Sequence, residues 1–166
     1  MLHVILLRRI LLLAALFAAP PVCLASPLYT TSLHEPLLGT PMGSIRKMGT
    51  LTAPDFEAVC ILRPYQDRLD ISGDLAARVN VHLAKVEYSS DEGHFAFVFV
   101  RKQGIEMERI KRSQKLDFFG NRKLPAAISD AVPHNFSQED CASGPSAAII
   151  KIRFDDRTYF LFGQAP

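Results

Sequence analysis

Phe95-Ala96-Phe97-Val98-Phe99-Val100 (FAFVFV, residues 95–100) is the most regular apolar stretch of this chain. Side chains alternate between the two faces of a β-strand, so the phenylalanines share one face and the alanine and valines share the other. Both faces are therefore apolar, which is typical of a strand that is covered on both sides. We expect a central strand here, in a domain built mainly from β-structure.

The segment before this strand has two interpretations. Ser89–Gly93 has the composition of a turn, which would make Val79–Tyr88 the hairpin partner of the central strand. The apolar residues of 75–87 also recur at helical spacing, and Asp74 is a suitable cap for a helix. The β-branched valines favour the strand, so we expect a strand, with a helix over about 75–87 as the alternative.

Turn residues divide the other apolar runs into short elements. Strands are expected at 57–62, 68–72 and 105–110. A short helix is expected at 124–132, because one proline lies in its first turn and another follows it.

The end of the chain has a clear hairpin pattern. Asp155-Asp156 separate two apolar runs, 148–154 and 157–162. A two-residue turn at this point predicts three cross-strand pairs and leaves Lys151 and Arg153 pointing outward. The pairs are Ile150 with Leu161, Ile152 with Tyr159, and Phe154 with Arg157. The expected fold is a single small antiparallel sandwich or open barrel with one short helix; α+β is the alternative.

Residues 1–25 have the organisation of a secretory signal peptide. Arg8-Arg9 precede an uncharged apolar run, 10–19, which is short for the roughly 20 residues that span a bilayer. Cys23-Leu24-Ala25 place small residues where a signal peptidase reads the chain. We therefore expect a mature chain that begins at Ser26, has no transmembrane segment, and is periplasmic or secreted.

The mature chain is expected to contain an arm and one domain. Prolines and glycines alternate in residues 26–54, which predicts a flexible arm before a single domain over 55–166. Removing Arg8 and Arg9 from the 19 basic residues leaves 17, which equals the 17 acidic residues. A neutral domain lacks the basic surface typical of general nucleic-acid binding, so no nucleic-acid partner is expected.

Two cysteines, Cys60 and Cys141, remain in the mature chain. An even number of cysteines in an oxidising compartment predicts a disulfide. The chain-entropy model gives such a long loop about 4 kcal/mol of stabilisation. The alternative is that one of the two is a reactive thiol.

The sequence contains no pattern typical of catalysis or metal binding. The four histidines of the mature chain lack the i, i+4 spacing of a helical zinc site: His34, His82, His94 and His134. Neither a G-x-S-x-G motif nor a glycine-rich phosphate loop occurs. The acid pairs lie in predicted turns, where carboxylates hydrogen-bond local backbone: Asp91-Glu92, Glu139-Asp140 and Asp155-Asp156. We expect no catalytic residue, no metal and no cofactor.

The densest charge cluster lies in residues 109–115 and contains four basic side chains: Arg109, Lys111, Arg112 and Lys115. Such a cluster is a candidate patch for an anionic partner, such as a glycan, a lipid headgroup or an acidic protein. Acidic residues nearby favour the alternative, a solvated loop after a strand.

These observations favour an exported, non-catalytic binding or interaction module whose partner is an envelope protein or an anionic surface. Its contact surface would be the basic cluster or the open face of the terminal hairpin. The alternative function is a small secreted hydrolase, which requires a concave pocket holding His82 or His94 beside a carboxylate. A third hypothesis is a ligand carrier with a cavity lined by the phenylalanines of 95–100.

Overall fold

The structure, a computed structural model, describes residues 32–120 and 123–166. The expected signal peptide lies outside these residues. The elements follow in this order: α1 (His34–Gly39), β1 (Ile45–Lys47), a 3-10 turn (Met48–Thr50), β2 (Phe56–Leu62), α2 (Asp74–Lys85), β3 (His94–Arg101), β4 (Gly104–Lys111), β5 (Asp117–Phe118), α3 (Ala126–Ser129), β6 (Ser137–Gln138), β7 (Cys141–Ser143), β8 (Ala147–Phe154) and β9 (Arg157–Gln164).

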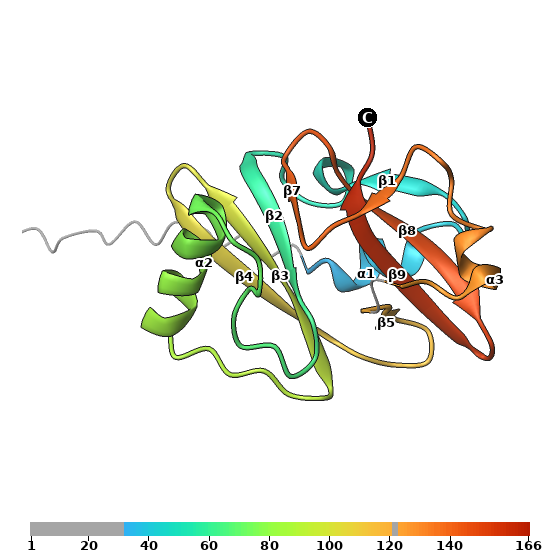
Figure 1. The fold of residues 1–166 in the computed structure, drawn as a ribbon, viewed down its shortest axis with the longest axis horizontal. Coiled ribbons are helices and arrows are strands. Elements are labelled where there is room, and N and C mark those ends of the chain that lie inside the picture. The colour runs from blue at the N-terminus through green and yellow to red at the C-terminus, as the bar shows by residue number, and fades with distance from the viewer. Residues whose placement is uncertain (1–31, 121–122) are drawn as a thin grey trace, which may run out of the picture. The chain divides into compact units, whose positions relative to one another are not determined.

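Two sheets pack against each other as a sandwich (Figure 1). One sheet has the order β4-β3-β2-β7. The other has the order β1-β8-β9-β5, and β6 also pairs with β9. The described strand pairs are antiparallel except for β5 with β9. The expected mainly β fold is confirmed as a sandwich, and it is not a closed barrel.

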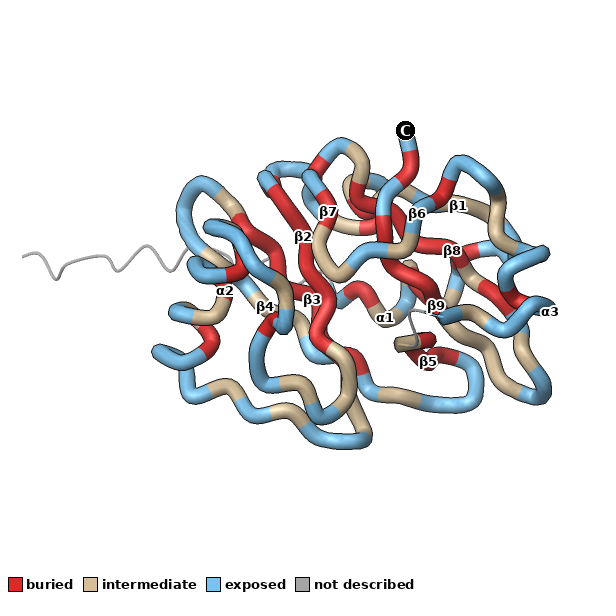
Figure 2. Tube along the Cα trace, in the orientation of Figure 1, coloured by how far each residue is buried: buried red, intermediate tan, exposed pale blue. Residues whose placement is uncertain are grey.

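Strand β3 is central in its sheet, as its apolar pattern predicts. It pairs with β2 and β4, and residues 95–100 are buried (Figure 2). Phe95, Phe97 and Phe99 pack into the core between the sheets. The opposite face, with Val98 at its centre, packs under α2. Burial on both sides explains why no polar residue interrupts this strand.

Helix α2 corrects the expected strand at 79–88 and matches the alternative interpretation. Ala76, Val79 and Leu83 form one buried stripe at helical spacing. Val81, which a strand would bury beside Val79, is 70% exposed. Most residues of the segment are good helix formers, and each valine lowers helix propensity by less than about 0.7 kcal/mol. Burial of the stripe against the sheet outweighs this penalty.

Residues 32–54 differ from the expected flexible arm. They form α1, β1 and the 3-10 turn, and they contribute Leu33, Leu37 and Met48 to the core between the sheets. These apolar residues are spaced irregularly between prolines and glycines, so no period in the sequence reveals their burial. The remainder of the expected arm, residues 26–31, lies outside the described residues.

The expected strand at 68–72 is an irregular loop. The side chain of Asn80 in α2 forms two hydrogen bonds with the backbone of Leu69. Its Oδ1 accepts from the Leu69 N–H at 2.7 Å, and its Nδ2 donates to the Leu69 carbonyl at 3.0 Å. A side chain from the helix therefore takes the place of a neighbouring strand and fixes this loop against α2.

The terminal hairpin has the predicted register, including Ile152 opposite Tyr159. Its expected open face is covered, however, because α3 and neighbouring loops pack on it. The covering residues include Phe119, Ile128 and Phe136. Lys151 also differs from its expected outward position: it is half-buried, its ammonium lies 5.8 Å from the ring centroid of Phe160, and it donates to the Leu38 carbonyl at 2.6 Å.

Candidate functional site

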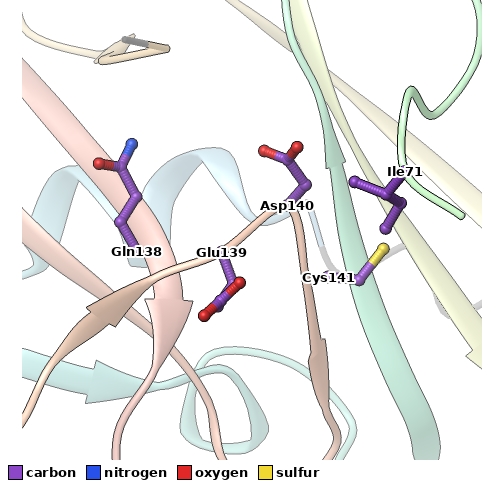
Figure 3. A pocket seen from close by; sticks show the side chains of 5 residues that line it. All are labelled: Ile71, Gln138, Glu139, Asp140 and Cys141. Carbon is purple, nitrogen blue, oxygen red and sulfur yellow. The ribbon is translucent and has the colours of Figure 1, made fainter. Parts of the chain in front are cut away.

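The Cys60–Cys141 disulfide is confirmed. It joins two directly paired residues of β2 and the edge strand β7, 81 positions apart in the chain. A hollow of about 290 Å³ lies beside it, lined by Ile71, Gln138, Glu139, Asp140 and Cys141 (Figure 3).

The acidic residues of this hollow do not form a facing pair. Figure 3 shows the Glu139 and Asp140 carboxylates directed to different sides, as expected for neighbours in an extended segment. Asp140 forms an ion pair with Arg63, and Glu139 accepts a hydrogen bond from Ser137 Oγ at 3.1 Å. Glycosidase chemistry requires two carboxylates facing each other across a bound sugar, and this arrangement lacks that geometry.

The four basic residues of the predicted anionic-partner patch differ in their surroundings. Arg109 of β4 forms an ion pair with Asp91, and Arg112 forms one with Asp117. Lys111 and Lys115 are exposed. Two of the four cations therefore already neutralise carboxylates of the same domain, and an anionic partner would chiefly meet the two lysines.

Asp117 is fully buried and organises a small ionic cluster. Its carboxylate accepts from Arg112 Nε at 2.6 Å, from Arg157 Nη1 at 2.7 Å and from the Phe118 N–H at 2.7 Å. Burial alone would raise the pKa of Asp117, but the hydrogen bonds from the two arginines outweigh it and lower the pKa. The cluster ties the end of β4 to β9, which is a structural role.

The histidines do not assemble into a metal site. His94 Nδ1 lies 2.8 Å from Asp91 Oδ1, and this hydrogen bond is the first cause of a lowered pKa for Asp91. His34 lies in α1, His82 in α2, and His134 in a loop. Within residues 32–120 and 123–166, no group of three or more His, Cys, Asp or Glu side chains is placed to hold a metal ion.

The hydrolase hypothesis requires His82 or His94 in a concave pocket. Four hollows of the described chain lie beside the disulfide, the C-terminal residues, the Arg63–Asp70 loop and α2, and neither His82 nor His94 lines these four. His94 and Asp91 form a histidine–carboxylate pair at the start of β3.

The phenylalanines of 95–100 fill the interior. The Phe97 ring centroid lies 5.8 Å from that of Phe162, and the Phe95 centroid lies 5.7 Å from that of Phe118. Rings at these separations are in packing contact. This packing leaves the carrier hypothesis without support from the phenylalanine face.

The hollow beside α2 has the largest volume of these four, about 570 Å³. Apolar side chains of the helix form one wall, the loop at Asp67 and Arg68 forms the other, and Tyr88 follows the helix. Its lining is Asp67, Arg68, Ala77, Asn80, Val81, Leu83, Ala84, Glu87 and Tyr88. We call this hollow and the adjoining loop 63–70 the α2 face.

Two exposed large apolar side chains lie on the α2 face. Val81 lines the hollow and Tyr65 lies in the adjoining loop, and each is 70% exposed. Met42 and Val86 are the other exposed large apolar side chains of the described residues, and neither lines these hollows. Tyr65 lines a second hollow, which shares Asp67 and Arg68 with the first. An apolar concentration with a polar rim is typical of an interaction surface.

Two residues of this face have a backbone conformation that residues other than glycine rarely adopt. Tyr65 has φ 62° and Glu87 has φ 52°, in the left-handed region where glycine is normally found. Such conformations carry an energetic penalty of order 1–3 kcal/mol and often occur at functional sites. Asp155, the remaining non-glycine example in the described chain, lies in the hairpin turn and has a local explanation.

The α2 face was not predicted from the sequence, because the β-branched valines favoured a strand in this segment. In a helix, Ala77, Val81 and Ala84 lie on a side away from the buried stripe, which would have marked them as apolar residues without a core to pack against. No motif identifies the loop wall, since its position depends on the hydrogen bonds between Asn80 and Leu69.

The fold defines this chain as a two-sheet β-sandwich that carries one covering helix and a disulfide between neighbouring strands. Neither a protein-family model nor a curated protein nor a solved structure matches it. None of the helices in the described residues is long and apolar enough to cross a membrane.

Proposed function

We propose that this protein is an exported, non-catalytic binding or interaction module that contacts its partner through the α2 face. One observation carries the proposal: Val81 is exposed in the wall of an apolar hollow, and Tyr65 is exposed in the adjoining loop. Burial of such exposed apolar area against a partner is favourable, because it removes the area from water. By contrast, the ion pairs of Arg63, Arg109 and Arg112 are formed with carboxylates of the same domain.

Export is supported by the signal-peptide pattern of residues 1–25 and by the disulfide, which fits an oxidising compartment. Mass spectrometry of the exported protein tests it. The expected mass is that of a chain beginning at Ser26 and lacking the two thiol hydrogens. A chain that retains residues 1–25, or that carries two free thiols, would contradict this part of the proposal.

The contact surface is tested by site-specific photocross-linking in cells that produce the protein. A photoreactive amino acid replaces Val81 in one variant and Lys102 in another. Lys102 is the control because it is exposed in the turn between β3 and β4. We expect a discrete adduct from position 81 and none from position 102. The absence of an adduct at 81, or equal adducts at both positions, would contradict the α2 face as the contact surface.

An anionic surface remains a second candidate partner, because Lys111 and Lys115 are exposed in the same strand-and-loop segment. The double substitution Lys111→Glu and Lys115→Glu tests it without disturbing Arg112, which holds Asp117. Unchanged binding to vesicles containing anionic lipid would remove this surface from consideration.

The secreted hydrolase is the alternative function, and the contact of His94 with Asp91 is the observation in its favour. It predicts hydrolysis of a panel of ester, peptide and glycoside substrates by the purified exported chain. Activity that His94→Gln abolishes would establish this alternative and overturn the non-catalytic proposal.

A further inference from the structure

We infer that the α2 face recognises a basic segment of a partner protein, with an apolar side chain in the hollow and a flanking lysine or arginine beside Glu87 and Asp67. This inference rests on the proposed function and names the chemistry of the partner. It combines three features of the face: its apolar wall, the balance of charge on its rim, and the position of Glu87.

The hollow suits an apolar side chain. Ala77 and Ala84 are small, so a partner can approach the helix closely between them. Val81 is mostly exposed and Tyr88 is half-buried, so both can lose exposed area when a side chain enters. A volume of about 570 Å³ exceeds that of one aliphatic side chain and admits a short segment of a partner.

The rim of the hollow carries an excess of negative charge. Its charged lining residues are Asp67, Glu87 and Arg68. Arg68 Nε also lies 4.0 Å from Asp70, a carboxylate outside the hollow. Asp67 accepts the Ser90 N–H at 2.8 Å, and this hydrogen bond lowers the pKa of Asp67. A cation flanking the apolar side chain complements this rim.

Glu87 occupies a position that usually favours glycine. The Tyr88 N–H donates to the Leu83 carbonyl at 2.9 Å, and the Glu87 N–H donates to the Ala84 carbonyl at 3.2 Å. These two bonds form a Schellman motif, in which Glu87 is the left-handed residue after the helix. Its φ is 52°, and its carboxylate lies near the negative end of the helix dipole.

Both local effects disfavour a glutamate at this position, and neither would disfavour glycine. The carboxylate is therefore placed on the rim at the expense of local stability. Recognition of a cation supplies a reason for that placement, since function can oppose stability at a binding site.

Two synthetic peptides provide the probe. Both form an amphipathic helix with the same leucine positions; one carries lysines on its polar side and the other carries glutamates. We expect the exported protein to bind the lysine peptide about tenfold more tightly, with NMR shift changes at Ala77, Val81 and Ala84. Equal binding of the two peptides, or shift changes confined to other surfaces, would overturn the inference.

Variants of Glu87 separate recognition from stability. Glu87→Gln removes only the charge and should weaken lysine-peptide binding about three- to tenfold. Glu87→Gly should weaken binding equally and raise the melting temperature by a few degrees, because it relieves the left-handed strain. Glu35→Gln is the control, since Glu35 is exposed in α1, and it should leave binding unchanged. A Glu87→Gln protein that binds like the parent would contradict the role of this carboxylate.

The cross-linking experiment tests the contact surface separately from the charge of the partner. An adduct at position 81 together with no preference for the lysine peptide would refute the basic partner and leave the α2 face as the contact surface. The absence of both results would refute the inference and the proposed contact surface together.

Discussion

Glu108 of one sheet and Lys151 of the other bind the two ends of α1. The Glu108 carboxylate accepts a hydrogen bond from the Leu33 N–H where the helix begins, and Lys151 Nζ donates to the Leu38 carbonyl near its end. The acid thus lies at the positive end of the helix and the ammonium at the negative end. A six-residue helix is too short to be stable alone, so these contacts and buried Leu37 hold it between the sheets.

Glu108→Gln tests the charge at the start of this helix. Burial raises the pKa of Glu108 more than the Leu33 N–H lowers it, so the neutral acid is more favoured in the folded state than in the unfolded state. The resulting stability is present below the unfolded pKa of about 4.3 and is lost as the pH rises through the folded pKa. Glutamine keeps a side-chain oxygen that accepts the Leu33 N–H but carries no charge. The Glu108→Gln variant should therefore be at least as stable as the parent at pH 7, and the two proteins should be equally stable below about pH 4.

Urea denaturation at the two pH values measures this effect. Glu108→Ala is the companion variant; it loses the acceptor and should be about 1 kcal/mol less stable than Glu108→Gln at both. A glutamine variant clearly less stable than the parent at neutral pH would show that the charged carboxylate is the favoured form.

Asp117→Asn should have the opposite pH behaviour. The pKa of Asp117 is lowered in the folded protein. The stabilisation that its ionised carboxylate gives the fold is therefore present above the unfolded pKa of about 3.9 and is lost as the pH falls through the folded pKa. We expect a loss of about 2 kcal/mol at pH 7, because one carboxylate serves both Arg112 and Arg157. Because Arg112 and Arg157 are partly exposed, the expected loss of stability is smaller than for a fully buried ion pair.

Denaturation across a range of pH gives the check. The Asn variant should show a shallower loss of stability below pH 4 than the parent. Asp156→Asn, in the exposed hairpin turn, is the control and should follow the parent curve. An Asp117→Asn curve parallel to the parent would mean that the two arginines do not stabilise the ionised carboxylate.

Local periodicity predicted the elements whose buried residues repeat at a regular spacing along the sequence. Strand β3 repeats its apolar pattern on both faces, and the β8–β9 hairpin sets its own register through a two-residue turn. Such strands predict a small antiparallel sandwich or open barrel, and the two sheets of the structure form the sandwich. By contrast, Leu33 and Leu37 are buried against residues from distant parts of the chain, and distant Glu108 and Lys151 bind the ends of α1; no local pattern records these contacts.

The candidate site was less predictable than the fold. The disulfide follows from compartment and cysteine number, but the α2 face depends on whether helical or strand periodicity governs 74–85. Arg112 shows a related limit: in the sequence it belongs to a basic cluster, whereas the fold brings Asp117 and Arg157 to it. Charge in a sequence does not reveal which charges become partners.

Replacing both cysteines by serine, Cys60→Ser with Cys141→Ser, should lower the free energy of unfolding by about 4 kcal/mol. The bridge closes a loop with a sequence separation of 81 residues, and its removal restores the entropy of the unfolded chain. Guanidinium denaturation compares the double variant with the oxidised parent. The parent under reducing conditions is the matched control and should lose a similar amount. A double variant with the parent's stability would show that the bridge contributes nothing to the folded state.

A pair of valine substitutions decides between helix and strand in α2. In a strand, Val79 and Val81 would lie on the same face, and aspartate at either position would disrupt the core equally. In the helix, Val79 is fully buried and Val81 is 70% exposed. Val79→Asp should therefore lower the free energy of unfolding by more than about 3 kcal/mol, because it buries a carboxylate without a partner. Val81→Asp should change it by less than about 1 kcal/mol. Chemical denaturation of the two variants provides the measurement, and equal losses would return this segment to a strand and remove the α2 face.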